Sequence, residues 1–369
     1  MDTDEDAVAG TVPSATAKRR RGTEDGCSSG EAAQGSASAG AQQDSSATTE
    51  VDAAYFSSYD DLSVHALMLG DASRLGAYAA AFRLGRAALH GKTVLDVGAG
   101  SGVLSLLAAR LGGAARVYAV EAAPGMASLA RRLAAANGLD GVVHVVEGRA
   151  EEVELPEQVD VIISEWMGFY LLHESMLEAV LAARSRWLKP SGIMLPSSAR
   201  IWAVIVEAEG LRMELESYQC LHGLDLSAVA EAELARRCRK PDVELLESQR
   251  LLAQPLVAWE CNDFCNLRCG ATAEVTAELS FVALRAGRVA ALALWFDVGF
   301  AVPTQSKPDG KQVIELSTGP GAPATHWKQT VVHLGCFVPV EAGDVLPVRL
   351  LLRQSDDNPR QYEITVESS

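Results

Sequence analysis

The chain has 369 residues, and 48% of them are hydrophobic, which is enough for two domains that each bury a core. No apolar run reaches the roughly 20 residues that cross a bilayer, and the first residues lack the apolar stretch of a secretory signal, so we expect no membrane association. The net charge of −16 disfavours direct nucleic-acid binding and favours basic protein partners, although an acidic surface also serves solubility. Seven unevenly spaced cysteines indicate a reducing compartment.

Residues 1–50 are rich in Ala, Ser, Gly, Thr and acids and contain almost no large apolar side chains. Such a segment cannot offset the entropy lost on ordering, so we predict a disordered acidic tail. The tail carries Lys18-Arg19-Arg20-Arg21, which fits a nuclear import signal and a chance run of bases about equally well. We expect a nuclear protein and leave the cytoplasm open as a second compartment.

Residues 51–196 are expected to form an α/β domain. Helical spacing of apolar residues over 51–89 predicts two helices, and from there strands and helices alternate. The predicted strands cover 94–97, 117–120, 142–146 and 159–164, and the predicted helices cover 103–111 and 126–136. This alternation predicts a Rossmann-like parallel sheet with helices on both faces.

Residues 197–369 are expected to form a second, antiparallel β-barrel-like domain. From residue 256 onward the chain reads as strands broken by turns at 285–287 and 356–359. Residues 209–252 carry helical signals and many charges but no core of their own, and we call this segment the arm.

A glycine-rich turn follows the first predicted strand, in VLDVGAGSG from Val94 to Gly102. Its spacing is G-x-G-x-G, it contains no base that would meet a phosphate, and Glu121 ends the next strand, where an acid bonds ribose hydroxyls in nucleotide-binding folds. These features favour a nucleoside ligand without phosphates, of which S-adenosylmethionine is the common one. The alternative is a structural turn followed by a surface acid.

Two carboxylates follow the strand 159–164, in VDVIISEWMGFYLLHESM. Glu165 comes directly after the strand and Glu174 closes the loop, at the edge where open α/β sheets place their ligands. A cation is the natural occupant of such a pair. Taken alone, Glu165 would more often be a plain loop acid, and Glu174 a helix N-terminal acid favoured by the helix dipole.

Five stretches together resemble the protein arginine methyltransferase family, in its type I branch. They are VLDVGAGSGVLS, VYAVEA, EEVELPEQVD, SEWMGFYLLHESML and Thr325-His326-Trp327-Lys328-Gln329, and the resemblance runs from about Tyr55 to Tyr362. It implies a homodimer that assembles through the segment 209–252. It also implies transfer of methyl groups from S-adenosylmethionine to arginine.

The resemblance also implies roles for single residues, whereas each of them alone would more often be plain packing or a surface group. The implied cofactor contacts are His65, Arg74, Asp96, Gly98, Gly100, Glu121 and Glu151, with Tyr55 and Tyr59 closing over the cofactor. Glu165 and Glu174 would clamp the substrate guanidinium, and His326 would pair with Asp71 beside it. Met68, Met176 and Trp327 would shape the acceptor site, and no metal is expected.

The sequence departs from the family at three places. It stops soon after the predicted strand 362–366, where the family commonly adds another strand, so we expect an open sheet edge there. Ala66 and Leu67 stand where the family has two glutamates, and Phe169 replaces a tyrosine in the glutamate loop. A run of three cysteines, Cys261, Cys265 and Cys269, resembles the cluster ligands of radical adenosylmethionine enzymes, but its last gap is wrong and we interpret these as incidental thiols.

The sequence therefore predicts an enzyme that forms monomethyl and asymmetric dimethyl arginine on histone tails and Arg/Gly-rich proteins, with a role in transcription or chromatin regulation. Guanidinium has a pKa above about 12, so full deprotonation at pH 7 would cost roughly 7 kcal/mol, and a carboxylate clamp is the better way to activate it. The alternative is a weakly active or inactive scaffold that acts as a transcriptional coregulator, motivated by the changed first helix.

Overall fold

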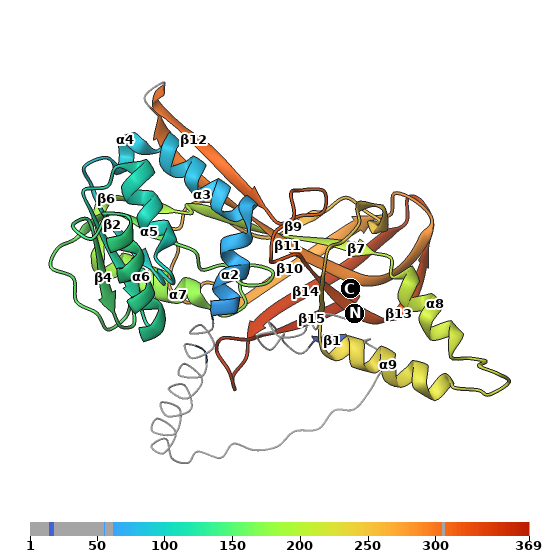
Figure 1. Cartoon of the computed structure of the whole chain (residues 1–369). Coiled ribbons are helices and arrows are strands. Elements are labelled where there is room, and N and C mark those ends of the chain that lie inside the picture. Colours follow the sequence, from blue (N-terminus) through green and yellow to red (C-terminus); the bar gives the residue numbers. More distant parts are fainter. Residues whose placement is uncertain (1–14, 18–54, 56–61, 305–306, 369) are drawn as a thin grey trace, which may run out of the picture.

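The computed structural model of the protein describes residues 15–17, 55, 62–304 and 307–368. Its N-terminal half contains a parallel sheet of order β4-β3-β2-β5-β6 (Figure 1). The strands are β2 (Thr93–Val97), β3 (Arg116–Glu121), β4 (Val143–Glu147), β5 (Val159–Ser164) and β6 (Leu188–Leu195). The inner strands β2, β3 and β5 are almost entirely buried, as expected for a parallel sheet covered on both faces.

Helices precede and connect these strands, as the alternation predicts. They are α2 (Leu62–Gly70), α3 (Ala72–Leu84), α4 (Arg86–Leu89), α5 (Val103–Leu107) with its π-helical continuation η2 (Ala108–Gly112), α6 (Pro124–Ala136) and α7 (Met176–Trp187). The Asp71 carboxylate caps α3, and Pro124 starts α6. Among the described residues, none of the helices is both long and apolar enough to cross a membrane.

The fifth strand, β6, was not among the predicted strands. The sequence from Lys189 to Gly192 contains Pro190 and reads as a turn, yet it lies inside β6. The strand is at the edge of the sheet, and its pairing with β5 shifts register between Val159 and Val161. An edge strand tolerates proline because one side of it makes no ladder hydrogen bonds, which explains the wrong prediction.

The C-terminal half is built from two antiparallel sheets that form the barrel-like domain. The long strands are β7 (Ser198–Val206), β9 (Leu256–Cys261), β10 (Glu274–Val282), β11 (Gly287–Thr304), β12 (Lys307–Ser317), β13 (Gln329–Val340), β14 (Val345–Gln354) and β15 (Tyr362–Ser368). Buried and exposed residues alternate along β10, so one face of it packs on the core. Strand β7, which begins just after the cis peptide Leu195–Pro196, was also not predicted from the sequence.

The β11–β12 hairpin ties this domain to the first one by running beside α3 (Figure 1). Gly85 allows the approach, because a Cβ there would lie 2.7 Å from Cγ1 of Val302. The Tyr78 ring meets Phe300 edge-on at 4.7 Å, and the Tyr78 hydroxyl donates to the carbonyl of Ser164 at the end of β5. Barrel, helix and parallel sheet are therefore packed together next to the loop that follows β5.

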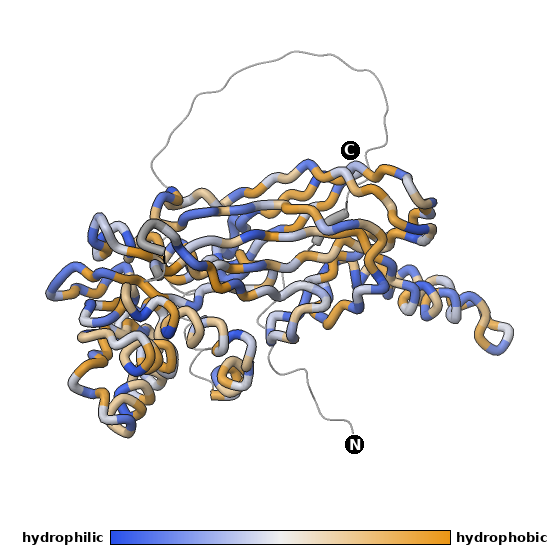
Figure 2. Tube along the Cα trace, turned by 90° about the horizontal axis from the view of Figure 1, so that it is seen from above, coloured by the Kyte–Doolittle hydropathy of each residue, from blue (hydrophilic) through white to orange (hydrophobic). Residues whose placement is uncertain are grey.

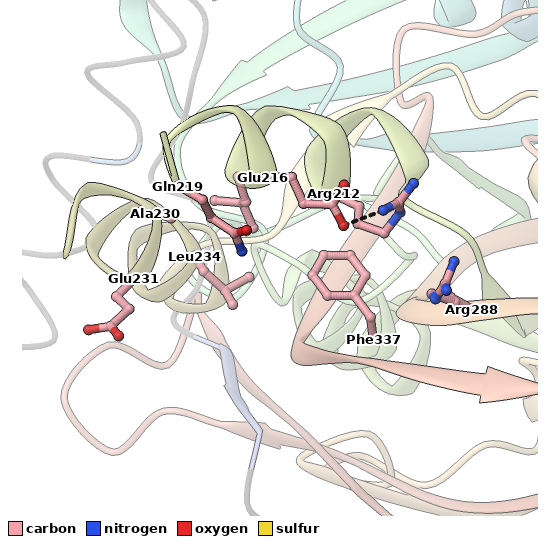
Figure 3. Close-up of a pocket in the computed structure, with 9 residues that line it drawn as sticks. Arg212, Glu216, Gln219, Ala230, Glu231, Leu234, Arg288 and Phe337 are labelled. Atoms are coloured by element: carbon pink, nitrogen blue, oxygen red, sulfur yellow. Dashed lines mark hydrogen bonds and ion pairs between the residues drawn. The ribbon is translucent and has the colours of Figure 1, made fainter. Parts of the chain in front are cut away.

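The predicted arm comprises α8 (Glu209–Ser217) and α9 (Ser227–Arg239), after which the chain returns through β8 (Asp242–Glu244) and the short helix η3 (Ser248–Arg250). The arm projects from the end of the barrel (Figure 2). A cavity of about 330 Å³ lies between the arm and the barrel and is lined by Leu215, Leu234 and Phe337, among others. Figure 3 shows Leu234 on the arm and Phe337 on the barrel. This cavity is at the opposite end of the molecule from the glycine turn (Figure 1).

The described part of the N-terminal tail covers part of the sheet edge at β15, which we expected to be open. Ala15–Ala17 form a short strand, β1, which pairs in parallel with Ile364 to Val366 of β15. The prediction of an open edge is therefore wrong at these residues, because the same chain supplies a further strand. The rest of the predicted disordered tail, including the basic run 18–21, lies outside the described residues.

Candidate active site

The glycine turn between β2 and α5 has the backbone conformation that its sequence indicates. Gly98, Gly100 and Gly102 all have positive φ, between 54° and 78°. The Gly100 N–H donates to Oε2 of Glu121 at 2.6 Å, and the Ala123 N–H donates to the other oxygen at 2.7 Å. Burial raises the pKa of Glu121, and the two N–H bonds partly oppose this shift. Glu121 thus ends β3 directly beside the turn.

Asp96 precedes the turn and is fully buried at the end of β2. Its Oδ2 accepts from the Ser105 hydroxyl at 2.6 Å, whereas its buried Oδ1 has no hydrogen-bond partner in the described structure. Burial raises the pKa of Asp96 to about 7, and the bond from Ser105 opposes the shift. A buried acceptor without a partner costs free energy, so a bound donor would fit here.

The two acids of the glutamate loop occupy different surroundings. Oε2 of Glu165 accepts from Nε and Nη2 of Arg74, at 3.0 and 2.8 Å. Glu174 has a left-handed backbone, with φ 75°, and its Oε2 accepts from the Tyr55 hydroxyl at 2.9 Å. Glu165 is therefore held by α3 and Glu174 by the segment that precedes α2.

The Thr-His-Trp loop comes from the barrel and reaches the start of α3. Nδ1 of His326 lies 2.7 Å from Oδ2 of Asp71, and the His326 N–H donates to the same oxygen at 2.9 Å. Trp327 is buried, and its Nε1 donates to the carbonyl of Met167 at 2.8 Å. The expected contact between His326 and Asp71 is thus present, and Trp327 anchors the loop against the strand end that carries Glu165.

Two of the remaining candidates contact the turn, and two do not. The buried His65 ring contacts Gly100, since a Cβ at that glycine would be 2.9 Å from it, and Cε of Met176 would be 3.6 Å from a Cβ at Gly98. Met68 offers its carbonyl to Nη1 of Arg74 at 3.2 Å. Glu151 is exposed near the surface, where Arg186 donates to its carbonyl.

Not every candidate can be placed. Tyr59 lies outside the described residues. Of the family departures, Leu67 is exposed on α2, and the Phe169 ring faces His173 at 5.8 Å. The cysteine run shows no metal site, since the described residues include no group of three His, Cys, Asp or Glu side chains that could hold an ion.

Two residues of this region were missed by the sequence analysis. Ser105 bonds Asp96, and Arg360, which lies in the turn between β14 and β15, bonds the backbone of Glu174. Ser105 follows the glycine turn in the resembling stretch and could have been noticed there. Arg360 follows an ordinary Asn-Pro turn signal, and no local pattern indicates its contact.

The residues at the turn fit S-adenosylmethionine. The unpaired Oδ1 of Asp96 suits an ammonium group, the buried guanidinium of Arg74 suits a carboxylate, and Glu121 stands where ribose hydroxyls are bonded. The turn from Gly98 to Gly102 contains no base to meet a phosphate. Fold and site together define an S-adenosylmethionine-dependent methyltransferase.

Comparison with known proteins shows to which family of methyltransferases the chain is similar. Residues 94–192 match the family profile "Methyltransferase domain", and residues 197–369 match "Arginine methyltransferase oligomerization subdomain". The chain is 36% identical to "Probable protein arginine N-methyltransferase 6" of Arabidopsis thaliana, over 87% of this chain and 80% of the relative. It is also 36% identical to "Protein arginine N-methyltransferase 6" of Xenopus laevis, over 87% of this chain and 92% of the relative.

Solved structures agree with the sequence comparison. The protein arginine methyltransferase 10 of Arabidopsis thaliana, in a uniquely open conformation, superposes with a TM-score of 0.74 at 36% identity, over 84% of this chain and 93% of that one. The Trypanosoma brucei PRMT1 enzyme-prozyme heterotetrameric complex with AdoHcy gives a TM-score of 0.75 at 30% identity, over 85% and 94%. The chain belongs to the protein arginine methyltransferase family.

Proposed function

We propose that the protein is a type I arginine methyltransferase, forming monomethyl and asymmetric dimethyl arginine on histone tails and Arg/Gly-rich proteins. The observation that carries this proposal is the position of Glu165 and Glu174 in one loop after β5, with Met176 reaching the glycine turn. Two acids next to a methyl-donor site suit a guanidinium acceptor. They bind its charge and orient one nitrogen.

The two carboxylates have a specific task in this reaction. They hold the guanidinium by charge-assisted hydrogen bonds and draw its positive charge toward two nitrogens, so that the third keeps electron density for attack. When bound, S-adenosylmethionine supplies a methyl group on a positively charged sulfur. Two unit charges about 4 Å apart near a protein surface attract by roughly 4 kcal/mol before desolvation, so binding and orientation supply much of the rate.

His326 is proposed to assist removal of the proton that the acceptor nitrogen loses. Asp71 accepts from its Nδ1, which leaves Nε2 as the basic atom of the ring. The tilted Trp327 ring, whose centroid is 4.0 Å from that of His326, restrains the imidazole on one side. This arrangement fixes the orientation of the imidazole ring.

The methionines support the asymmetric product. Met68 and Met176 are both partly buried, and the end of Met176 lies next to Gly98. Methionine side chains are flexible and suit the filling of space around an acceptor. In our proposal they leave room for a second methyl group on the nitrogen that already carries one, and they exclude the opposite nitrogen from the methyl donor.

The proposed partners are a second copy of the chain and basic proteins. The match to an oligomerization subdomain supports a dimer or a larger oligomer, and exposed apolar residues on the arm, Met213 and Leu224, support the arm as the contact. The net charge of −16 supports attraction of basic histone tails. The basic run at 18–21 supports a nuclear location, and with it a role in transcription or chromatin regulation.

Mass spectrometry of a histone-tail peptide and a Gly-Arg-rich peptide, incubated with the protein and S-adenosylmethionine, tests this proposal. We expect arginine to gain first one methyl group and then a second on the same nitrogen. Symmetric dimethylation, or monomethylation alone, would contradict type I specificity. Cofactor binding without any transfer would instead support the scaffold alternative, which the exposed Leu67 in place of a family glutamate motivates.

A further inference from the structure

We propose that Arg360 is a positioning residue for methyl transfer, which acts on the glutamate loop from the barrel domain. Arg360 lies in the turn between β14 and β15, within the part of the chain that matches the oligomerization subdomain. Glu174 lies just before α7, on the methyltransferase side of the molecule. The contacts between them cross from one half of the protein to the other.

Arg360 fixes the backbone of Glu174 from two sides. The Glu174 N–H donates to the Arg360 carbonyl at 2.7 Å, and Nη1 of Arg360 donates to the Glu174 carbonyl at 3.2 Å. Glu174 and Ser175 both have left-handed backbones, with φ 75° and 54°, a conformation that is unfavourable for a residue other than glycine. Such a backbone persists only where its surroundings hold it, and these bonds are part of that restraint.

Arg360 also reaches the Glu174 carboxylate through an aromatic ring. Its guanidinium carbon lies 3.9 Å from the centre of the Tyr55 ring, a cation–π contact, and the Tyr55 hydroxyl donates to Oε2 of Glu174 at 2.9 Å. The ring is therefore held between the arginine and the acid. Replacing the Arg360 side chain would keep the bond from the Glu174 N–H to the Arg360 carbonyl. It would remove the bond to the Glu174 carbonyl and the contact with Tyr55, which bonds the Glu174 carboxylate.

The third contact involves the product-shaping methionine. Nη1 of Arg360 lies 3.5 Å from Sδ of Met176, whose terminal methyl group lies next to Gly98. A methionine side chain has three rotatable bonds, so a contact at its sulfur limits the conformations that its terminal methyl group can adopt. Without the anchor, Met176 would move into the room that a methylated nitrogen needs, and the second transfer would suffer more than the first.

Arg353 provides a matched control in the same hairpin. It lies on β14, its side chain is 46% exposed, and it pairs with Asp356 and Glu363 at the surface. Exposed ion pairs of this kind contribute little to stability. Arg353→Ala therefore removes the same kind of side chain without touching the glutamate loop.

The test compares full-length Arg360→Ala, Arg360→Lys and Arg353→Ala with the wild type, by kcat, by KM for peptide and cofactor, and by the ratio of mono- to dimethyl arginine. A misplacement of about 1 Å costs on the order of 100-fold in rate, so we expect Arg360→Ala to lower kcat of the first transfer by about 10- to 100-fold. The cofactor KM should change by less than about threefold, since Arg74 and Glu121 keep their contacts. The monomethyl share should rise.

The two other variants decide what the loss means. Lysine keeps the charge but lacks the planar group that stacks on Tyr55, so Arg360→Lys should recover only part of kcat, and Arg353→Ala should match the wild type. Folded Arg360→Ala with wild-type kcat and product ratio would overturn the proposal, as would equal losses in Arg353→Ala. If Arg360→Ala does not fold, wild-type kinetics in Arg360→Lys would overturn it.

The product ratio rests on the proposed type I specificity, whereas kcat of the first transfer does not. A wild-type protein that stops at monomethyl arginine would refute type I specificity and leave the rate comparison of the Arg360 variants intact. The two failures are therefore distinguishable.

Discussion

Arg74 and Glu165 form a buried ion pair that joins the candidate cofactor site to the candidate substrate clamp. Both bonds end on Oε2 of Glu165, and the two side chains are only 6% and 9% exposed. In our proposal, Arg74 binds a carboxylate of the cofactor and Glu165 binds the guanidinium of the substrate. In the protein alone, the positive charge of Arg74 and the negative charge of Glu165 neutralise each other.

Breaking this pair from one side should cost more than removing it altogether. Arg74→Met leaves the buried Glu165 charge without its partner, and loss of one member of a buried pair costs about 3–5 kcal/mol. We expect the double variant Arg74→Met/Glu165→Gln to regain most of that free energy of unfolding, because no uncompensated charge remains. Urea unfolding of the wild type, Arg74→Met, Glu165→Gln and the double variant measures the coupling free energy between the two side chains. If the double variant loses the sum of the two single losses, the prediction is refuted.

Asp71 should make the folded protein sensitive to acid. Burial alone would raise its pKa, but hydrogen bonds from His326 and from the Arg74 N–H outweigh burial, and the pKa lies below the ordinary value of 3.8. A carboxyl whose folded-state pKa is lowered adds stability above its unfolded pKa and loses it as pH falls through the folded value. Between pH 7 and pH 3, the midpoint temperature of thermal unfolding should fall more steeply for the wild type than for Asp71→Asn. An equal fall in both proteins would contradict this role.

Asp96 should make the stability of the protein fall, and cofactor binding tighten, as pH rises. Because burial raises its folded-state pKa to about 7, stability is highest when it is protonated and falls as pH rises from 3.8 toward 7. Its charged form is the better acceptor for an ammonium group. Calorimetry with S-adenosylhomocysteine should therefore show tighter binding from pH 6 to pH 8, and Asp96→Asn should bind more weakly with a flatter pH dependence. An unchanged slope in Asp96→Asn would refute the assignment.

The arm should control assembly. Met213 and Leu224 are 62% and 63% exposed on or beside its helices, and burying such side chains against a partner contributes about 1.5–3 kcal/mol each. We expect Met213→Glu/Leu224→Glu to shift the protein toward monomer in light scattering. Val313→Glu, at a 54% exposed site on β12, is the control and should leave the oligomer intact. An equal shift toward monomer in both variants would contradict the proposal that the arm forms the contact between subunits.

Much of the parallel sheet follows from sequence because its strands are short apolar runs that end in glycine turns or acids. Val94–Val97 and Val159–Ser164 illustrate this, and each lies where its pattern predicts. β6 escaped because Pro190 and Gly192 are turn signals everywhere except at a sheet edge. Pairing along an edge depends on neighbours that a local pattern does not contain.

The candidate site was harder to predict because its contacts join distant parts of the chain. His326 and Asp71 are 255 residues apart, and only the family resemblance brought them together before the structure did. Arg360 bonds Glu174 once through its backbone carbonyl and once through its guanidinium, and nothing in the local sequence around either residue indicates these contacts. Local chemistry indicated the acids and glycines, whereas the fold supplied their partners.

Methyl transfer by Glu165→Gln is the most direct test of the arginine clamp. Glutamine keeps the shape of the side chain and removes the charge that would hold a guanidinium, and lost transition-state contacts of this kind cost about 100- to 1,000-fold in kcat. We predict that transfer of labelled methyl groups to a Gly-Arg-rich peptide falls by at least about 100-fold, while calorimetry shows S-adenosylhomocysteine still binding. Transfer at the wild-type rate by a folded Glu165→Gln protein would contradict the account.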